Sequence, residues 1–326
     1  MYDVITVGSA TVDVYAKTEF SEVLKGKGKE DCIAYPIGSK ILIKELTLTS
    51  GGGGTNTAVA LARLGHKVAF LGKIGSRENS RRVLDELKQE KVGTSLIVSS
   101  KKGRTGYSII LDSIKHDRTI LVFRGSNNDL RYNEVKIKKL KAKWFYFSTM
   151  MQESFRTLEK LASYAKKNNI RIMFNISSYL AKKGINYLRN ILKKINVLVL
   201  NKEEAAILIG KNKIEGLLAK LHKLGPEIVA ITDGENGAWV FHDNIVYYGK
   251  PNKVKVVETT GAGDAFASSF LSGMIKKNDI EFAIRLGMTN AESVISYHGA
   301  KNKLLTYKEA LRMMNKRPIK VIKREL

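Results

Sequence analysis

The sequence predicts an α/β protein: a doubly wound, mostly parallel sheet with helices on both faces, plus a small β-sheet lid. Two observations predict this fold. Between residues 144 and 232, short runs rich in Val and Ile alternate with amphipathic segments, as in chains that build a parallel sheet covered by helices. Residues 33–50 and 105–123 instead alternate loosely between apolar and polar side chains, which is typical of strands with one exposed face.

The predicted core begins with a buried strand at residues 4–8 that ends in Gly-Ser. After a glycine run, a helix is expected with Thr55 as its N-cap and Gly65 at its C-terminal end, because Ser, Thr and Gly favour these positions. Short strands and amphipathic helices then alternate. Strands are expected at residues 68–71, 144–147, 171–175, 197–200 and 228–232, and helices at residues 79–90, 154–168, 181–194, 202–209 and 215–223.

The predicted lid combines two separate parts of the chain. Residues 17–31 are expected to be irregular, and the strands at residues 33–50 are expected to pair with a hairpin. This hairpin joins strands at residues 106–111 and 119–123 through the turn Lys115-His116-Asp117. The lid then comprises residues 17–49 and 104–124, and the α/β core comprises residues 1–16, 50–103 and 125–326.

Composition limits the classes of function. The single cysteine, Cys32, excludes an internal disulfide and a multi-cysteine metal site. The first residues do not resemble a signal peptide, and no apolar stretch approaches the roughly 18 residues of a membrane span. We therefore expect a cytoplasmic protein without a membrane partner.

The formal net charge is +25, from 56 basic and 31 acidic residues, which makes nucleic acid a candidate partner. The lysines are spread along the chain, however, with the densest runs at residues 136–143 and 316–324, and no nucleic-acid-binding signature accompanies them. We therefore favour a solvated lysine surface over a nucleic-acid interface. Such a surface also attracts anionic substrates.

The segment with the strongest chemical signal is Gly261-Ala262-Gly263-Asp264. A strand is expected to run into this turn, and a buried helix is expected to follow it. Small residues at a helix N-terminus let an anion approach the free backbone amides, and Asp264 could accept a proton from a substrate hydroxyl. The structural alternative is that Asp264 is an acidic residue favoured at a helix N-terminus.

Residues 258–266, Glu-Thr-Thr-Gly-Ala-Gly-Asp-Ala-Phe, resemble the C-terminal signature of the ribokinase-like (pfkB-type) carbohydrate kinases. Further motifs follow the family's order along nearly the whole chain. The resemblance implies a ribokinase-like fold and ATP-dependent phosphorylation of a sugar hydroxyl. It also implies that Asp264 is the catalytic base and that Gly261, Ala262 and Gly263 form the anion hole.

Two N-terminal motifs resemble the family's substrate-binding segments. The run Ser50-Gly51-Gly52-Gly53-Gly54-Thr55-Asn56 resembles its glycine motif, which implies that Gly51, Gly52, Gly53 and Asn56 contact the acceptor. Asp13 follows the first strand and is implied to bind substrate hydroxyls, since a carboxylate can accept two hydrogen bonds from a diol. A flexible loop and a surface turn are the structural alternatives.

The resemblance also implies a nucleotide site, with Mg²⁺ beside the phosphates of ATP. Glu204, within Asn201-Lys202-Glu203-Glu204, is implied to hold Mg²⁺ through water, and Glu258 to hold a monovalent cation such as K⁺. Glu258 stands where the family has Asp, and Lys303 could supply the charge instead, so potassium activation stays open. The residues implied to contact the nucleotide or its phosphates are Asn175, Asn201, Thr232, Gly234, Gly237 and Asn290.

The sequence leaves the acceptor open between a sugar, a nucleoside and a sugar phosphate. Arg104, Arg118 and Arg124 lie in or beside the lid and could bind the phosphate of a sugar phosphate. A nucleic-acid-binding protein on an inactive kinase scaffold is the alternative from another class. A homodimer through the lid is also expected, because open sheet edges seek partners.

Overall fold

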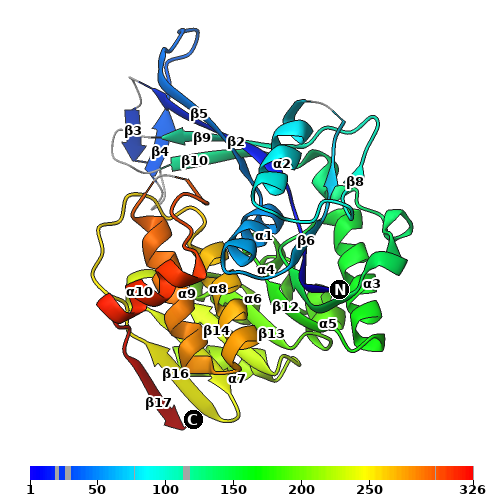
Figure 1. Ribbon diagram of the computed structural model, residues 1–326. Coiled ribbons are helices and arrows are strands. Elements are labelled where there is room, and N and C mark those ends of the chain that lie inside the picture. Colours follow the sequence, from blue (N-terminus) through cyan, green and yellow to red (C-terminus); the bar gives the residue numbers. More distant parts are fainter. Residues whose placement is uncertain (19–21, 26–30, 77, 113–117, 298, 326) are drawn as a thin grey trace.

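The computed structural model describes residues 1–18, 22–25, 31–76, 78–112, 118–297 and 299–325. Its larger sheet contains β1 (Tyr2–Val7), β6 (Val68–Leu71), β11 (Ala142–Phe147), β12 (Arg171–Asn175), β13 (Val197–Asn201), β14 (Ile228–Thr232), β15 (Ala238–His242), β16 (Ile245–Gly249) and β17 (Val321–Glu325). The strand order is β17-β16-β15-β14-β13-β12-β11-β1-β6 (Figure 1). The strands from β6 to β14 are parallel, and β15, β16 and β17 extend one edge in antiparallel pairs. The predicted mostly parallel sheet is confirmed.

Helices cover both faces of this sheet, as the doubly wound fold requires. They are α1 (Gly53–Arg63), α2 (Glu78–Gln89), α3 (Gln152–Lys167), α4 (Ser178–Ala181), α5 (Gly184–Leu192), α6 (Lys202–Ile209), α7 (Ile214–His222), α8 (Ala262–Lys277), α9 (Ile280–Ile295) and α10 (Tyr307–Lys316). Alternate strand residues point to opposite faces. Ile5 therefore packs with the residues of α3, α5, α6 and α7, and Val4 packs with those of α1, α2, α8 and α9.

Short 3₁₀ turns join some of these elements: η1 (Gly125–Asn128), η2 (Tyr132–Glu134), η3 (Ile137–Lys139) and η4 (Gly234–Asn236). Two short strands, β7 (Lys73–Ile74) and β8 (Val98–Ser99), pair in parallel as a separate two-stranded sheet. Among the described residues, no helix has both the length and the apolar character needed to cross a membrane.

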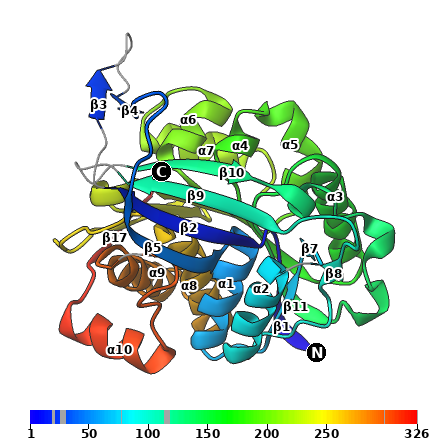
Figure 2. The same ribbon diagram turned by 90° about the horizontal axis from the view of Figure 1, so that it is seen from above.

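A smaller sheet lies across one end of the core, as Figure 2 shows. It contains β2 (Thr11–Thr18), β5 (Ile43–Gly51), β9 (Gly106–Asp112) and β10 (Arg118–Phe123), in the order β10-β9-β2-β5. We call this four-stranded sheet the lid sheet. Next to it, β3 (Glu22–Lys25) pairs with β4 (Asp31–Ala34). The predicted turn at residues 115–117 lies outside the described residues.

The lid differs from the prediction in its pairing. The hairpin β9–β10 was expected to pair with the strands at residues 33–50, but β2 lies between β9 and β5 and pairs with both. The lid sheet therefore begins at Thr11, ahead of the predicted boundary at residue 17. The segment 17–31, expected to be irregular, contains β3 and the start of β4.

Two predicted elements of the core were also wrong in detail. Helix α1 starts at Gly53 after an N-cap at Gly52, so Thr55 is not the cap; its hydroxyl donates to the Gly51 and Gly52 carbonyls. The helix predicted at residues 181–194 is divided into α4 and α5, because Gly184 has a φ of 79°. At the other end of α1, Gly65 adopts the expected left-handed conformation.

The strand predicted before the Gly-Ala-Gly turn is absent from the described structure, where residues 250–260 contain no strand. The amides of Val257 and Glu258 instead donate to the Ile295 carbonyl at the end of α9. The place beside β16 is taken by β17 from the C-terminus, so this segment has no strand of the larger sheet to pair with there.

Candidate active site

Polar residues surround a cavity of about 340 Å³ at the carboxyl ends of the parallel strands. Helices α1 and α8 contribute their first turns to it. Ligands of open α/β sheets bind outside the carboxyl ends of the strands, so this cavity is the candidate active site. Its lining residues are Ser9, Gly53, Arg124, Ser148, Thr149, Asn175, Ile176, Ser177, Tyr179, Val199, Leu200, Asn201, Glu204, Thr232, Gly261, Gly263 and Asp264.

The start of α8 is shaped by glycine. Gly261 has a φ of 82°, and a Cβ on it would lie 2.6 Å from the backbone of Ala300, so a side chain would force the two segments apart. Gly263 has open space where a side chain would lie. Because the first amides of a helix lack partners within it, this end of α8 can receive an anion. Gly261 and Gly263 line the cavity, whereas the predicted Ala262 does not.

Asp264 lies in the first turn of α8 and lines the cavity. The amide of Asn56 donates to its Oδ2 at 3.0 Å. Burial raises the pKa of Asp264 to about 6, although the Asn56 hydrogen bond and the charge of Lys301 oppose this rise. A carboxylate with this pKa is ionised at pH 7 and still basic enough to accept a proton from a hydroxyl in a transition state.

Asp13 and Gly51, both predicted to bind substrate, lie together at the ends of paired strands. Thr11 and Gly51 are register partners in β2 and β5, and a Cβ on Gly51 would lie 1.9 Å from Oδ2 of Asp13. The Thr11 hydroxyl donates to Asp13 Oδ1 at 2.8 Å. Burial raises the pKa of Asp13, against hydrogen bonds from Thr11 and Ser108. The carboxylate is thus held in a fixed orientation.

Gly52 and Gly53 connect Gly51, at the end of β5, to the cavity. Gly52 has a φ of 98°, and a Cβ on it would lie 2.5 Å from the carbonyl oxygen of Ser9, so the backbone needs glycine there. The amide of Gly53 donates to Ser9 Oγ at 3.2 Å. The glycine run therefore lets the lid sheet and α1 meet at the edge of the cavity.

A buried lysine, Lys301, contacts Ser50, which directly precedes the glycine run. Lys301 has a side chain only 7% exposed, and its ammonium donates to Glu86 at 2.6 Å and to the hydroxyl of Ser50. Burial lowers the pKa of Lys301, and the charge of Glu86 raises it. The positive charge lowers the pKa of both Asp13 and Asp264, so it favours the ionised form of the two acids.

The residues predicted for the nucleotide divide into two groups. Asn175, Asn201 and Thr232 end neighbouring strands and line the cavity. Gly234 and Gly237 do not line it; they shape the turn after β14, with φ values of 51° and 100°.

Asn290, also predicted to contact the nucleotide, does not line the cavity. It is fully buried; its amide donates to Ser269 at 2.7 Å and its oxygen accepts from the Leu305 amide at 3.0 Å. Both ends of the side chain are therefore used, which gives Asn290 a packing role between α8 and the segment after α9.

Six lining residues with hydrogen-bonding side chains were not assigned to this site from the sequence: Ser9, Arg124, Ser148, Thr149, Ser177 and Tyr179. Arg124 was considered only as a ligand for a sugar phosphate, and its guanidinium lies 4.4 Å from the ring centre of Tyr179. Ser148 directly follows β11, and ligands of open α/β sheets bind outside the carboxyl ends of the strands, so its position in the sequence could have indicated it.

Comparison with known proteins decides the family. The family model described as pfkB family carbohydrate kinase matches residues 1–306. The chain belongs to the pfkB family of carbohydrate kinases. An uncharacterized sugar kinase of Archaeoglobus fulgidus is 32% identical over 251 residues, which cover 76% of this chain and 98% of the relative. The protein is therefore a phosphotransferase with an alcohol group as acceptor.

Solved structures of this family show the same fold. The nucleoside kinase of Methanocaldococcus jannaschii has a TM-score of 0.81 and 22% identity, covering 97% of this chain and 99% of its own. The ribokinase of Arabidopsis thaliana, solved with ribose and ATP, has a TM-score of 0.81 and 21% identity, covering 96% and 98%. The predicted ribokinase-like fold is confirmed.

The acids predicted to hold cations in this pfkB kinase have structural partners. Glu204 accepts the Asn201 amide at 2.8 Å, and the Asn201 side chain accepts the Glu204 amide at 2.8 Å. Glu258 is buried and accepts the amide of Gly299 at 2.8 Å. Lys303 places its ammonium over the ring of Tyr297 at 5.1 Å. Within the described part of the chain, no cluster of three or more His, Cys, Asp or Glu could hold a metal.

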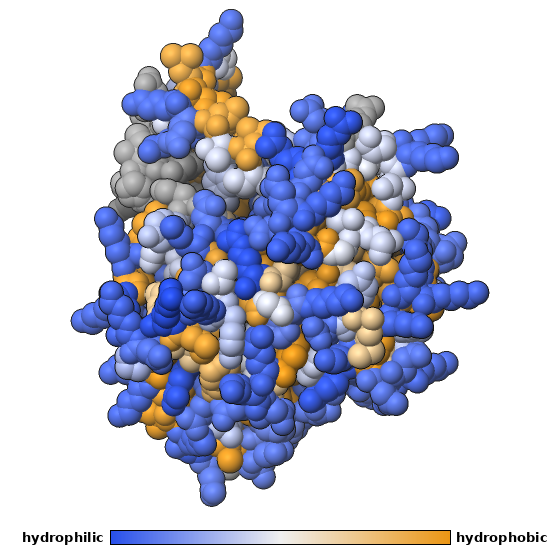
Figure 3. Space-filling view, viewed as in Figure 1, coloured by the Kyte–Doolittle hydropathy of each residue, from blue (hydrophilic) through white to orange (hydrophobic). Residues whose placement is uncertain are grey.

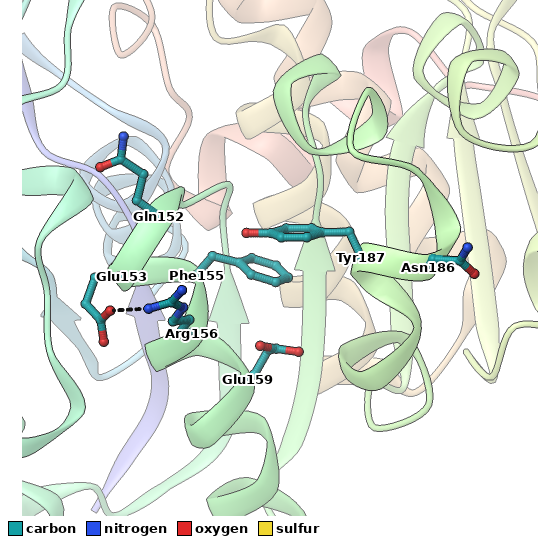
Figure 4. A pocket seen from close by; sticks show the side chains of 7 residues that line it. All are labelled: Gln152, Glu153, Phe155, Arg156, Glu159, Asn186 and Tyr187. Carbon is teal, nitrogen blue, oxygen red and sulfur yellow. Dashed lines mark hydrogen bonds and ion pairs between the residues drawn. The ribbon is translucent and has the colours of Figure 1, made fainter.

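Another cavity of the kinase, of about 490 Å³, lies between α3 and α5. Figure 4 shows the Tyr187 ring facing that of Phe155, and their centres are 4.4 Å apart. Arg156 pairs with Glu153 at 3.1 Å beside them. Although this cavity is larger, none of the predicted site residues lines it.

Proposed function

We propose that this kinase transfers the γ-phosphoryl group of ATP to a hydroxyl of a sugar, as a ribokinase or fructokinase does. The observation that carries the proposal is the position of Asp264: it lies in the first turn of α8, shares a hydrogen bond with Asn56 of α1, and lines the cavity with Gly53, Gly261 and Gly263. A proton acceptor and an anion-binding helix end thus face one space.

The proposed roles follow from this geometry. Asp13, Asn56 and the backbone of Gly51, Gly52 and Gly53 orient the acceptor sugar. Asp264 accepts the proton of the reacting hydroxyl as its oxygen bonds to the γ-phosphorus. The bond from that phosphorus to the bridging oxygen breaks, and ADP leaves with the electron pair. The amides of Gly261, Ala262 and Gly263 stabilise the charge on the transferring group.

We also propose the partners of the nucleotide. Asn175, Asn201, Thr232 and the turn with Gly234 and Gly237 lie at or next to the carboxyl ends of β12, β13 and β14, where the nucleotide would bind. Glu204 lines the cavity, where a carboxylate could hold a water ligand of Mg²⁺, which prefers to keep several waters. Mg²⁺ would supply neutralisation of the phosphate charge. Glu258 is the proposed ligand of a monovalent cation.

Two observations bear on the acceptor. Similar structures include a ribokinase and a nucleoside kinase, so a nucleoside is the second candidate. Arg124 lines the cavity, which is the feature that favours an anionic acceptor such as a sugar phosphate. The screen below separates these classes.

We expect ATP-dependent ADP release with free pentoses or hexoses, and weaker release with nucleosides and sugar phosphates. A coupled ADP-release assay over these three classes, with and without K⁺, measures it. Higher kcat/KM for a nucleoside or a sugar phosphate would move the assignment to that class. Absence of ATP turnover with steeply salt-dependent nucleic-acid binding would instead favour an inactive scaffold.

We further propose a homodimer through the lid sheet. Its two edge strands carry exposed apolar side chains, including Leu46 on β5 and Phe123 on β10, with 55% and 52% exposure. Figure 3 shows apolar side chains on the projecting end of this region, amid a largely hydrophilic surface. Sedimentation velocity at micromolar concentration should give twice the monomer mass, and Leu46→Lys should reduce it. A wild-type monomer would contradict the proposal.

A further inference from the structure

The hydroxyl of Ser148, in the candidate active site, is buried and has no hydrogen-bond partner among the described residues. Ser148 follows β11, and its amide donates to the Val7 carbonyl at 2.9 Å, which fixes its backbone. The side chain is 4% exposed, and among the described residues Oγ has no hydrogen-bond partner. An unpaired buried hydroxyl is costly, and such groups in native structures call for an explanation, such as a ligand.

The hydroxyl lies beside the proposed base. A Cβ on Gly53 would lie 3.1 Å from Ser148 Oγ and 3.6 Å from Asp264 Oδ1, so the two oxygens border the same small space. Glycine at position 8 is needed for this placement, because a Cβ there would lie 1.9 Å from Ser148 Oγ. The backbone on both sides of Ser148 thus leaves room for its hydroxyl at the reacting end of the cavity.

The other side chains of the cavity indicate which ligand this hydroxyl meets. Ser177 also lines the cavity, and its Oγ has no partner within the described residues. The cationic guanidinium of Arg124 lines it as well. With the amides at the start of α8, these groups form a set rich in donors. A phosphoryl oxygen only accepts hydrogen bonds, so it matches this set better than a sugar hydroxyl does.

We propose that Ser148 donates a hydrogen bond to an oxygen of the phosphoryl group while that group is transferred. This inference rests on the proposed kinase function. Ser148 makes and breaks no covalent bond: the acceptor oxygen bonds to phosphorus, the bridging oxygen leaves with ADP, and the acceptor proton goes to Asp264. The Ser148 hydroxyl keeps its own proton and stabilises the charge on the transferring oxygens.

The variant Ser148→Ala should lower kcat roughly 10- to 100-fold, as expected for losing a hydrogen bond to a charged group, and should leave the KM for ATP nearly unchanged. Ser126→Ala is the matched control. Ser126 is 5% exposed, and its Oγ also lacks a partner in the described structure, but it does not line the cavity. Its kcat should equal that of the wild type.

A binding measurement separates transition-state contact from a structural role. ADP with aluminium fluoride and Mg²⁺ mimics the transferring phosphoryl group, whereas ADP with Mg²⁺ alone does not. Ser148→Ala should lose most of the extra rise in melting temperature that aluminium fluoride gives, and keep the rise that ADP gives. An unchanged kcat, or an equal loss of both thermal shifts, would overturn the inference. An inactive wild type would instead refute the kinase function itself.

Discussion

Asp264→Asn is expected to lower kcat by roughly 10² to 10⁴, because the variant cannot accept the proton of the acceptor hydroxyl. The Asn56 amide can still donate to the oxygen of the new side chain, so the geometry of the cavity should persist. ATP affinity should stay within about twofold, since the change removes no donor from the start of α8. Steady-state kinetics with the best acceptor from the screen, and nucleotide titration, measure both quantities.

The pH dependence provides a second test of the same residue. Burial raises the pKa of Asp264 to about 6, and the base acts in its ionised form. The wild-type kcat/KM should therefore fall about tenfold per pH unit below pH 6 and level off above it. The exposed Asp243 lies in the turn between β15 and β16, and Asp243→Asn should keep the wild-type rate and profile. Full activity of Asp264→Asn would remove this acid from the mechanism.

Glu86→Gln is expected to cost about 2–4 kcal/mol of the free energy of unfolding, because it leaves a buried ammonium without its counter-ion. The Lys301 side chain is 7% exposed and that of Glu86 is 29% exposed. Water can therefore solvate an unpaired Glu86 carboxylate far better than an unpaired Lys301 ammonium. Urea unfolding monitored by fluorescence and circular dichroism measures the loss as a lower midpoint.

An exposed acid on the same helix provides the control for this change. Asp85 lies 4.0 Å from Lys88, and both side chains are more than half exposed, so Asp85→Asn should cost less than about 0.5 kcal/mol. Combining Glu86→Gln with Lys301→Met removes both charges and should recover part of the loss. A Glu86→Gln midpoint equal to that of Asp85→Asn would show that the ion pair adds no stability.

The sequence predicted the features of this kinase that short segments encode. Short runs rich in Val and Ile located the parallel strands, because burial on both faces of a sheet leaves few other residue choices. Helical periodicity located most of the helices. Gly261, Gly263 and Asp264 were recognisable since a helix N-terminus that receives an anion needs small residues at fixed positions. The roles assigned to these residues in catalysis stay predictions.

The features that the sequence did not predict depend on contacts between residues far apart along the chain. The ammonium of Lys301 meets Ser50 and Glu86, which are 251 and 215 positions away, and no local pattern indicates that a lysine is buried. The position of β2 between β5 and β9 likewise follows from sheet pairing across the chain. Thr55 was predicted to be the N-cap because threonine is common at that position. The helix begins earlier, after Gly52, whose backbone lies against that of Ser9.

The division of the proposed binding groups between the lid sheet and the helices of the core has an energetic consequence. Asp13 and Gly51 belong to the lid sheet, whereas Asn56 and Asp264 belong to helices of the core. A sugar held by both sets links the two parts, so any free energy needed to bring them together is subtracted from its measured affinity. Sugars that reach only one set would bind without that cost, and would be poor substrates but effective competitive inhibitors.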